Sequence, residues 1–330
     1  MASTVQAQDG HLVTKSGSAW RRSQSTGGAQ IRCFVAEFSV TVVRSCTSAS
    51  ATVTFVPDTR LPLGATEVHD LWSAQVEDTF RVFVGVRGDQ PQVTIVVSDG
   101  NGLFGLVVDT IRLMQIPALL PSMLVVGIGY PDASTVADTI DIRVRDLTPT
   151  PSSAYPGSGG ADRFLSFLRE TLFDWVSHRF PYALTTIVYF GHSLGGLLGV
   201  HALLAEQPLF SHSILSSPSL FWDSYAMFAR ERRRAETTRD LCALAFFGIG
   251  ALETDEGRRL EGRDLPEGHP RKPPATHLDM VDDLLRFTDC LRSRRYPNFD
   301  MEVAVYPDEF HATVPGTVLS HSLRRFFSHH

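Results

Sequence analysis

This chain of 330 residues contains few cysteines, has no long apolar run and carries only a small net charge. The four cysteines, Cys33, Cys46, Cys242 and Cys290, show no closely spaced pair. This spacing argues against zinc and C-x-x-C redox sites and predicts reduced thiols, with a bridge between Cys33 and Cys46 as the alternative. The absence of a long apolar segment predicts a cytoplasmic protein without membrane contact. A formal net charge of -6 gives no electrostatic basis for nucleic-acid binding.

The amino-terminal part of the chain differs in composition from the rest. Residues 1–30 are rich in Ser, Thr, Gln and Gly, and we expect them to be disordered because they bury too little apolar surface. Residues 31–64 are predicted to add two antiparallel strands, because side chains alternate over 31–56, and 57–64 is predicted to be a linker-like loop. A further strand pair is predicted at 67–76 and 79–86. We expect residues 31–330 to form a single domain.

From residue 93 onward, apolar strand-like runs alternate with amphipathic helix-like segments. Strands are predicted at 93–98, 123–129, 185–190, 213–216, 241–249 and 301–306, and helices at 103–115, 160–178 and 197–205. This order is typical of an α/β fold with a mostly parallel sheet flanked by helices. The polar stretch 254–274 is predicted to be a flap-like loop over the site, because it is too long for a simple connection.

The most informative motif follows the strand predicted at 185–190. Gly191-His192-Ser193-Leu194-Gly195 is a G-x-S-x-G nucleophile elbow, in which a strained strand-to-helix turn lifts a serine clear of the sheet. Small neighbours on both sides keep the crossing chains from colliding. We interpret Ser193 as the nucleophile and the backbone amide of Leu194 as an oxyanion donor. A glycine-rich turn whose serine merely caps the helix is the alternative.

Two further candidates follow later strands, at the edge where reactive groups gather in such sheets. Glu253 and His311 complete the chain order Ser, acid, His that is expected of an α/β-hydrolase. His311 is predicted to take the serine proton, and Glu253 to orient the imidazole ring. Asp255 and Glu256 are the alternative acids. The other histidines are interpreted as surface or core residues.

The loop after the strand at 93–98 is predicted to complete the oxyanion hole. Its sequence is Asp99-Gly100-Asn101-Gly102, and two glycines let the backbone approach a ligand closely. The amide of Asn101 is the predicted donor, with Gly102 as the alternate donor and a substrate contact. An ordinary Asp-Gly turn is the alternative interpretation.

Several motifs together carry a resemblance to a known family. They are Asp99-Gly100-Asn101, Val126 to Pro131, Arg145 to Thr150, Gly191 to Gly196, Ser216-Ser217-Pro218-Ser219 and Glu309-Phe310-His311. The set resembles the esterase D family of α/β-hydrolases, and is most similar to its siderophore-ester (trilactone) hydrolases. The resemblance extends from about Val68 to the carboxyl end. It implies the α/β-hydrolase fold and acyl chemistry on serine.

Specificity contacts are predicted beside this site. Arg143 and Arg145 are candidates to meet an anionic or catecholate group of the substrate, and structural pairing with Asp141 or Asp146 is the alternative. Trp222 resembles a family position near the acyl pocket, whereas a buried core aromatic is the alternative.

The sequence therefore predicts a serine carboxylic-ester hydrolase that cleaves a bulky ester or macrolactone through an acyl-enzyme. No cofactor, metal or partner is expected beyond the small-molecule substrate. An acyltransferase or thioesterase on the same fold is the first alternative, and a non-catalytic ligand-binding protein is the second. The natural ester, the oligomeric state and the role of residues 1–64 are left unassigned.

Overall fold

In a computed structural model of the chain, the described residues are 66–133, 137–262 and 278–328, together with five short strands before residue 57. The chain divides into two compact units, Met1–Pro62 and Leu63–His330. In the first unit β1 (Ala7–Gln8) pairs with β2 (His11–Leu12), and β3 (Arg32–Val35), β4 (Phe38–Thr41) and β5 (Thr54–Val56) form an antiparallel sheet. The described residues of the range 31–64 thus include three strands, where two were predicted. The disorder predicted for the remainder of 1–30 lies outside the described residues.

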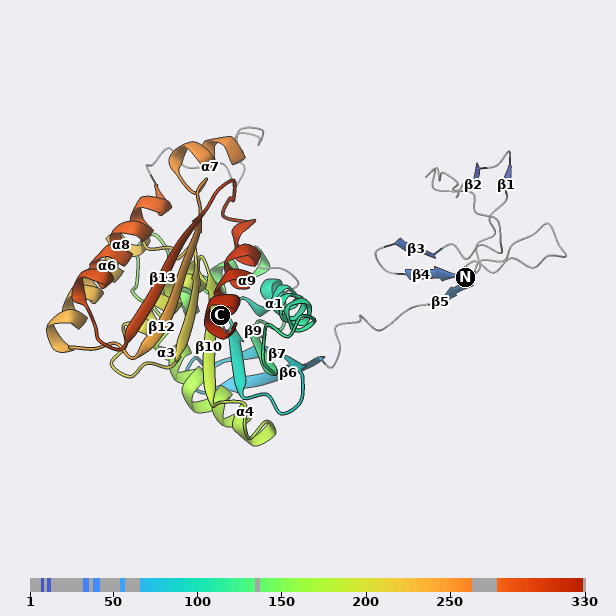
Figure 1. Cartoon of the computed structure of the whole chain (residues 1–330), viewed down its shortest axis with the longest axis horizontal. Helices are drawn as coiled ribbons and strands as arrows, with labels where there is room; N and C mark the ends of the chain where they lie inside the picture. The colour runs from blue at the N-terminus through green and yellow to red at the C-terminus, as the bar shows by residue number, and fades with distance from the viewer. Residues whose placement is uncertain are drawn as a thin grey trace. The chain divides into compact units, whose positions relative to one another are not determined.

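The second unit is built on an eight-stranded sheet (Figure 1). Its strands are β6 (Thr66–Ser73), β7 (Asp78–Arg87), β8 (Val93–Val97), β9 (Met123–Gly129), β10 (Thr186–His192), β11 (His212–Ser216), β12 (Ala243–Gly250) and β13 (Phe299–Tyr306). Their order is β13-β12-β11-β10-β8-β9-β7-β6. Strands β8 to β13 are parallel, whereas β6 and β7 form an antiparallel edge. The predicted α/β-hydrolase fold, with its mostly parallel sheet, is confirmed.

Helices cover both faces of this sheet. They are α1 (Gly100–Gln115), α2 (Ile140–Leu147), α3 (Ala161–Phe167), the π-helical turn η2 (Leu168–Leu172), α4 (Phe173–Arg179), α5 (Leu194–Leu203), α6 (Trp222–Thr237), α7 (Asp255–Gly262), α8 (Met280–Arg294) and α9 (Val314–Phe327). In Figure 1, α1 and α9 lie on one side of the sheet and α6 and α8 on the other. Helices α2 and α9 were not predicted. Helix α7 occupies the first part of the predicted flap, whose residues 263–274 lie outside the described residues.

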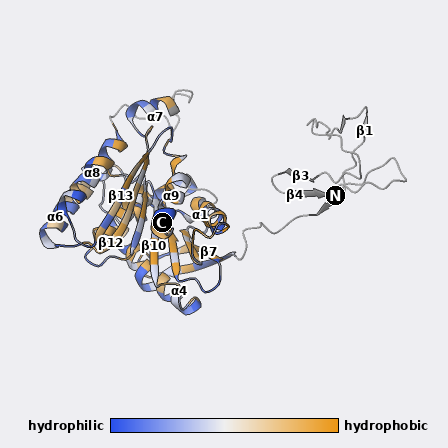
Figure 2. Ribbon diagram, in the orientation of Figure 1, coloured by the Kyte–Doolittle hydropathy of each residue, from blue (hydrophilic) through white to orange (hydrophobic). Residues whose placement is uncertain are grey.

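The core consists of one apolar cluster on each face of the sheet. Every residue of β8 and β9 is buried, as expected for central parallel strands that read as continuous Val, Ile and Leu runs. Consecutive residues of β12 serve opposite faces, because Phe246 packs in one cluster and Phe247 in the other. Figure 2 shows the central strands as hydrophobic ribbons between helices of mixed hydropathy. This rigid sheet fixes the loops that follow its strands.

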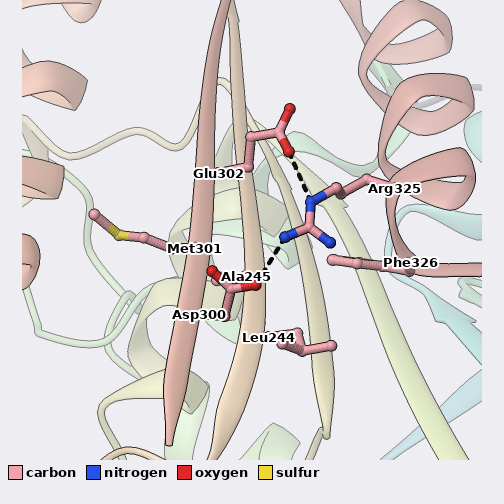
Figure 3. A pocket seen from close by; sticks show the side chains of 7 residues that line it. All are labelled: Leu244, Ala245, Asp300, Met301, Glu302, Arg325 and Phe326. Atoms are coloured by element: carbon pink, nitrogen blue, oxygen red, sulfur yellow. Dashed lines mark hydrogen bonds and ion pairs between the residues drawn. The ribbon is translucent and has the colours of Figure 1, made fainter. Parts of the chain in front are cut away.

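Helix α9 is attached to β13 by a pair of ionic contacts. Arg325 donates to Glu302 at 2.9 Å and to Asp300 at 2.8 Å (Figure 3). The cavity beside these side chains has a volume of about 10 Å³, which is room for one water molecule and too little for an organic ligand. The contacts therefore have a structural role, because they hold the two elements on either side of His311.

Helices α6 and α8 are joined by a bidentate ion pair. Arg294 donates to the two carboxylate oxygens of Glu231 at 2.7 and 2.9 Å, and Glu231 is buried. Such fork-shaped pairs are the strong form of this interaction.

Loss of this ion pair should destabilise the protein. Because Arg294→Ala leaves a buried carboxylate without its partner, we expect the free energy of unfolding to fall by about 1–3 kcal/mol in urea titrations. Arg292→Ala is the matched control, since Arg292 pairs with Asp289 where both side chains are exposed. That change should cost less than about 1 kcal/mol. Equal losses for the two variants would contradict the assignment.

Candidate active site

Ser193 lies at a strained corner between β10 and α5. Its backbone has φ 59° and ψ −116°, a conformation that L-residues rarely adopt, and its amide donates to the carbonyl of Ser216 at 3.0 Å. A Cβ atom at Gly191 would lie 2.3 Å from the carbonyl oxygen of Gly195, and one at Gly195 would lie 2.2 Å from Oγ of Ser98. At Gly191 only glycine fits, because the clash is with backbone atoms, whereas a side chain at Gly195 would require the Ser98 hydroxyl to turn away. The motif therefore forms the sharp turn expected of a nucleophile elbow.

The Ser193 hydroxyl and the neighbouring amide are both available for chemistry. Oγ of Ser193 lies 3.4 Å from Oγ of Ser219 and forms no hydrogen bond with His311, both residues being in the described part of the chain. The amide of Leu194, in the first turn of α5, has no hydrogen-bond partner among the described residues. It is thus free to donate to an oxyanion.

His311 and Glu253 are brought together from the ends of β13 and β12. Nδ1 of His311 donates to Oε2 of Glu253 at 2.6 Å. The Glu253 side chain is 2% exposed, whereas that of His311 is 36% exposed. Asp255 and Glu256, the alternative acids, lie in the first turn of α7, and Asp255 accepts a hydrogen bond from the amide of Leu278 at 2.7 Å. Of the three candidate acids, Glu253 is the one hydrogen-bonded to the histidine.

Both oxygens of the Glu253 carboxylate are engaged. Oε1 accepts hydrogen bonds from Oγ of Ser217 at 2.6 Å and from the amide of Gly250 at 2.9 Å. Oε2 is thereby left for His311. The sequence did not predict the contact with Ser217, because it joins residues that are 36 positions apart.

His192 was interpreted as a residue outside the site, yet its ring packs against that of His311. The two ring centroids are 4.4 Å apart, and Nδ1 of His192 lies 3.0 Å from Oγ of Ser216. Burial first, then the charges of His311 and Arg143, lower the pKa of His192 well below its ordinary value. His192 is therefore neutral at neutral pH and adds no charge beside His311.

The loop predicted to supply the second oxyanion donor begins at Asp99, which has φ 57°. The amides of Gly102 and Leu103 both donate to the carbonyl of Asp99, at 2.9 and 3.0 Å. The Gly102 amide is therefore occupied, whereas that of Asn101 has no partner among the described residues. Of the two predicted donors, Asn101 is the one that remains available.

The side chain of Asn101 holds this loop against the end of β9. Its Oδ1 accepts from the amide of Tyr130 at 2.8 Å. Its Nδ2 donates to the carbonyls of Tyr130 and Ala133, at 3.1 and 2.7 Å. Three hydrogen bonds thus fix the residue whose amide is the candidate donor.

Arg143 and Arg145, predicted as substrate contacts, are both engaged by carboxylates. Arg143 donates to both oxygens of Asp99, at 2.5 and 2.9 Å, and the Asp99 side chain is buried. Arg145 donates to Asp146 at 2.8 and 2.9 Å and to Asp78 at 2.7 Å. The structural pairing with Asp146 is thus present, whereas Arg143 pairs with Asp99 and not with Asp141. Neither arginine presents an unpaired guanidinium.

Trp222 lies one turn beyond Ser219 at the start of α6. It is buried, its Nε1 donates to the carbonyl of Thr150 at 3.1 Å, and its amide donates to the carbonyl of Ser219 at 3.1 Å. The ring of Tyr155, which is half exposed, lies 5.2 Å from the indole ring. Tyr155 was not predicted, and no motif marks it. Through its backbone amide, Trp222 is joined to Ser219, the serine that contacts Ser193.

In the described part of the chain, no group of histidine, cysteine, aspartate or glutamate side chains is placed to hold a metal ion. Within the same ranges, no helix combines the length and hydropathy needed to cross a bilayer.

Comparison with known proteins finds siderophore esterases among the relatives of this chain. The family model described as "Putative esterase" matches residues 89–265. The siderophore triacetylfusarinine C esterase of Aspergillus fumigatus is 32% identical over 248 residues, covering 73% of this chain and 82% of that protein. The siderophore enterobactin esterase of Emericella nidulans is 30% identical over 243 residues, covering 67% and 78%.

Solved structures agree with this. The siderophore hydrolase EstB from Aspergillus nidulans has 25% identity and a TM-score of 0.69, with 83% of this chain and 98% of that chain covered. The BES protein from Bacillus cereus has 22% identity and a TM-score of 0.67, with 84% and 100% covered, and supports the fold alone. The predicted resemblance to siderophore-ester hydrolases is confirmed. The chain belongs to this esterase family and is an ester hydrolase.

Proposed function

We propose that the protein is a serine esterase in which Ser193 is the nucleophile, His311 the base and Glu253 the orienting acid. The observation that carries the proposal is the 2.6 Å hydrogen bond between His311 and Glu253. Both residues follow the carboxyl ends of sheet strands, as does the strained Ser193. Because Glu253 engages Nδ1, Nε2 is the ring nitrogen left to accept the serine proton.

Acylation begins when the Ser193 hydroxyl turns from Ser219 toward His311 and attacks the ester carbonyl. Catalytic hydrogen bonds often form only once substrate is bound, so the resting contact with Ser219 is compatible with this step. His311 takes the proton, and the free amides of Leu194 and Asn101 stabilise the oxyanion. His311 then protonates the leaving alcohol. A water molecule repeats the sequence on the acyl-enzyme and releases the acid.

The proposed substrate is a siderophore ester, a bulky ester or macrolactone. Support comes from the relatives, whose names state that they act on triacetylfusarinine C and enterobactin. Support also comes from the half-exposed ring of Tyr155, which packs against the buried Trp222 and offers an aromatic surface to a large acyl group. A cytoplasmic location and a small-molecule substrate as the one partner remain predictions from the sequence.

Removal of the nucleophile should abolish turnover. We expect Ser193→Ala to lower kcat on p-nitrophenyl esters and on a trilactone by about four to six orders of magnitude, because a triad acts as a unit. Ser177→Ala, which removes an exposed hydroxyl from α4, is the matched control and should leave kcat unchanged.

Undiminished turnover by purified Ser193→Ala would refute the proposed mechanism. Fluorophosphonate labelling gives an independent measurement, since only an activated serine reacts. Product analysis with added alcohols distinguishes hydrolysis, which yields free acid, from acyl transfer.

Tyr155 should contribute to the binding of large substrates. We expect Tyr155→Ala to raise KM for siderophore and aryl esters about 3- to 10-fold, because a stacked aromatic surface is lost. KM for an acetyl ester should hardly change. Tyr182→Ala removes another exposed tyrosine and is the control. Equal KM changes on large and small esters would argue against an acyl-pocket role for Tyr155.

A further inference from the structure

The segment after β11, Ser216-Ser217-Pro218-Ser219, contacts three parts of the candidate machinery. Ser216 Oγ lies 3.0 Å from Nδ1 of His192, and Ser219 Oγ lies 3.4 Å from Oγ of Ser193. Ser217 Oγ donates to Glu253 at 2.6 Å. The contact between Ser217 and Glu253 is the shortest of the three, and both of these residues are buried.

We infer that Ser217 is a positioning residue for the reaction, acting through Glu253. The inference rests on the proposed function, since it requires Glu253 to be the acid that orients His311. Ser217 does not contact the reacting atoms. Its role is to hold the carboxylate so that one oxygen always faces the imidazole.

The two carboxylate oxygens of Glu253 have different hydrogen-bond partners. Oε1 is held by the Ser217 hydroxyl and the Gly250 amide, and Oε2 alone meets His311. A glutamate side chain has three rotatable bonds, so the carboxylate would otherwise sample several rotamers in which the imidazole loses its partner. With Oε1 bonded by donors from β11 and β12, the orientation of the second oxygen follows from the sheet itself.

The backbone of Ser217 gives an independent reason to assign its hydroxyl a role. Its φ is 43°, in the left-handed region where glycine is favoured and other L-residues are strained. A glycine would relieve that strain. The presence of a buried serine at this strained position is explained if its hydroxyl makes a required hydrogen bond, which glycine cannot make.

The donors also suit the charge on Glu253. A carboxylate that is 2% exposed needs hydrogen-bond donors in place of water, and Ser217 supplies one of the three that it has. Loss of the hydroxyl leaves Oε1 with the Gly250 amide alone. The carboxylate then has one anchor fewer in the orientation that serves His311.

The test compares two substitutions that remove the hydroxyl but differ in backbone strain. Ser217→Ala keeps the left-handed residue strained, whereas Ser217→Gly relaxes it. We expect both to lower kcat roughly 10- to 100-fold with KM unchanged, because a misplaced catalytic group costs rate and not binding. Ser217→Gly should unfold at a higher temperature than Ser217→Ala. Unchanged kcat in folded Ser217→Gly, or a change confined to KM, would overturn the inference.

A double-mutant cycle with Glu253→Ala separates positioning from general packing. If Ser217 acts through Glu253, Ser217→Gly should cause no further loss in the Glu253→Ala background, measured as the rate of fluorophosphonate labelling. The same fold-loss in both backgrounds would overturn the inference. Ser193→Ala distinguishes the two proposals. Activity retained by that variant refutes the mechanism, whereas an inactive Ser193→Ala beside fully active Ser217 variants refutes this inference alone.

Discussion

The hydrogen bond between His311 and Glu253 depends on the pairing of two neighbouring strands more than on the two side chains. Strands β12 and β13 are in parallel register over eight residue pairs, from Ala243 with Phe299 to Gly250 with Tyr306, so their ends are level. The loops that follow are themselves joined, because the amide of Leu252 donates to the carbonyl of Glu309 at 3.1 Å. Glu253 and His311 therefore leave the sheet side by side. Helix α9, attached to β13 through Arg325, anchors the chain beyond His311.

The oxyanion side of the site is held by a different kind of contact. This side is held by polar side chains and not by paired strands. Arg143 forms an ion pair with Asp99, and Asn101 forms hydrogen bonds with the backbone of Tyr130 after β9. Tyr189 of β10 links this side to the elbow, since its hydroxyl bonds both the Gly195 carbonyl at 2.7 Å and Oγ of Ser98 at 3.1 Å. The amides of Leu194 and Asn101 belong to two helix N-termini that are fixed to one another before any substrate arrives. Preorganisation of this kind makes oxyanion stabilisation effective.

The sequence predicted those features that depend on residues close together in the chain, and missed contacts between residues that are far apart in it. The elbow at Ser193 was predicted because its glycines and flanking periodicities lie within a few residues, and Glu253 and His311 because each follows a recognisable strand. The pairing of Arg143 with Asp99, 44 residues away, was missed, and so was the contact of Ser217 with Glu253. Arg143 lies in α2 and Asp99 follows β8, whereas Ser217 and Glu253 follow β11 and β12, so both contacts depend on the order of the strands in the sheet. Helix α2 was missed because it lies within an irregular, polar connection after β9.

Three of the contacts that build the site rest on residues whose backbone is left-handed. Asp99 has φ 57°, Ser193 has φ 59° and Ser217 has φ 43°, and they follow β8, β10 and β11, which are adjacent in the sheet. None is glycine, although glycine would adopt each conformation with less strain. At each position the side chain has a contact or a proposed role: the Asp99 carboxylate pairs with Arg143, the Ser193 hydroxyl is the proposed nucleophile, and the Ser217 hydroxyl donates to Glu253. The buried strands that precede these residues hold the strained backbone conformations in place. Substitution by glycine at these positions should therefore raise stability and lower activity.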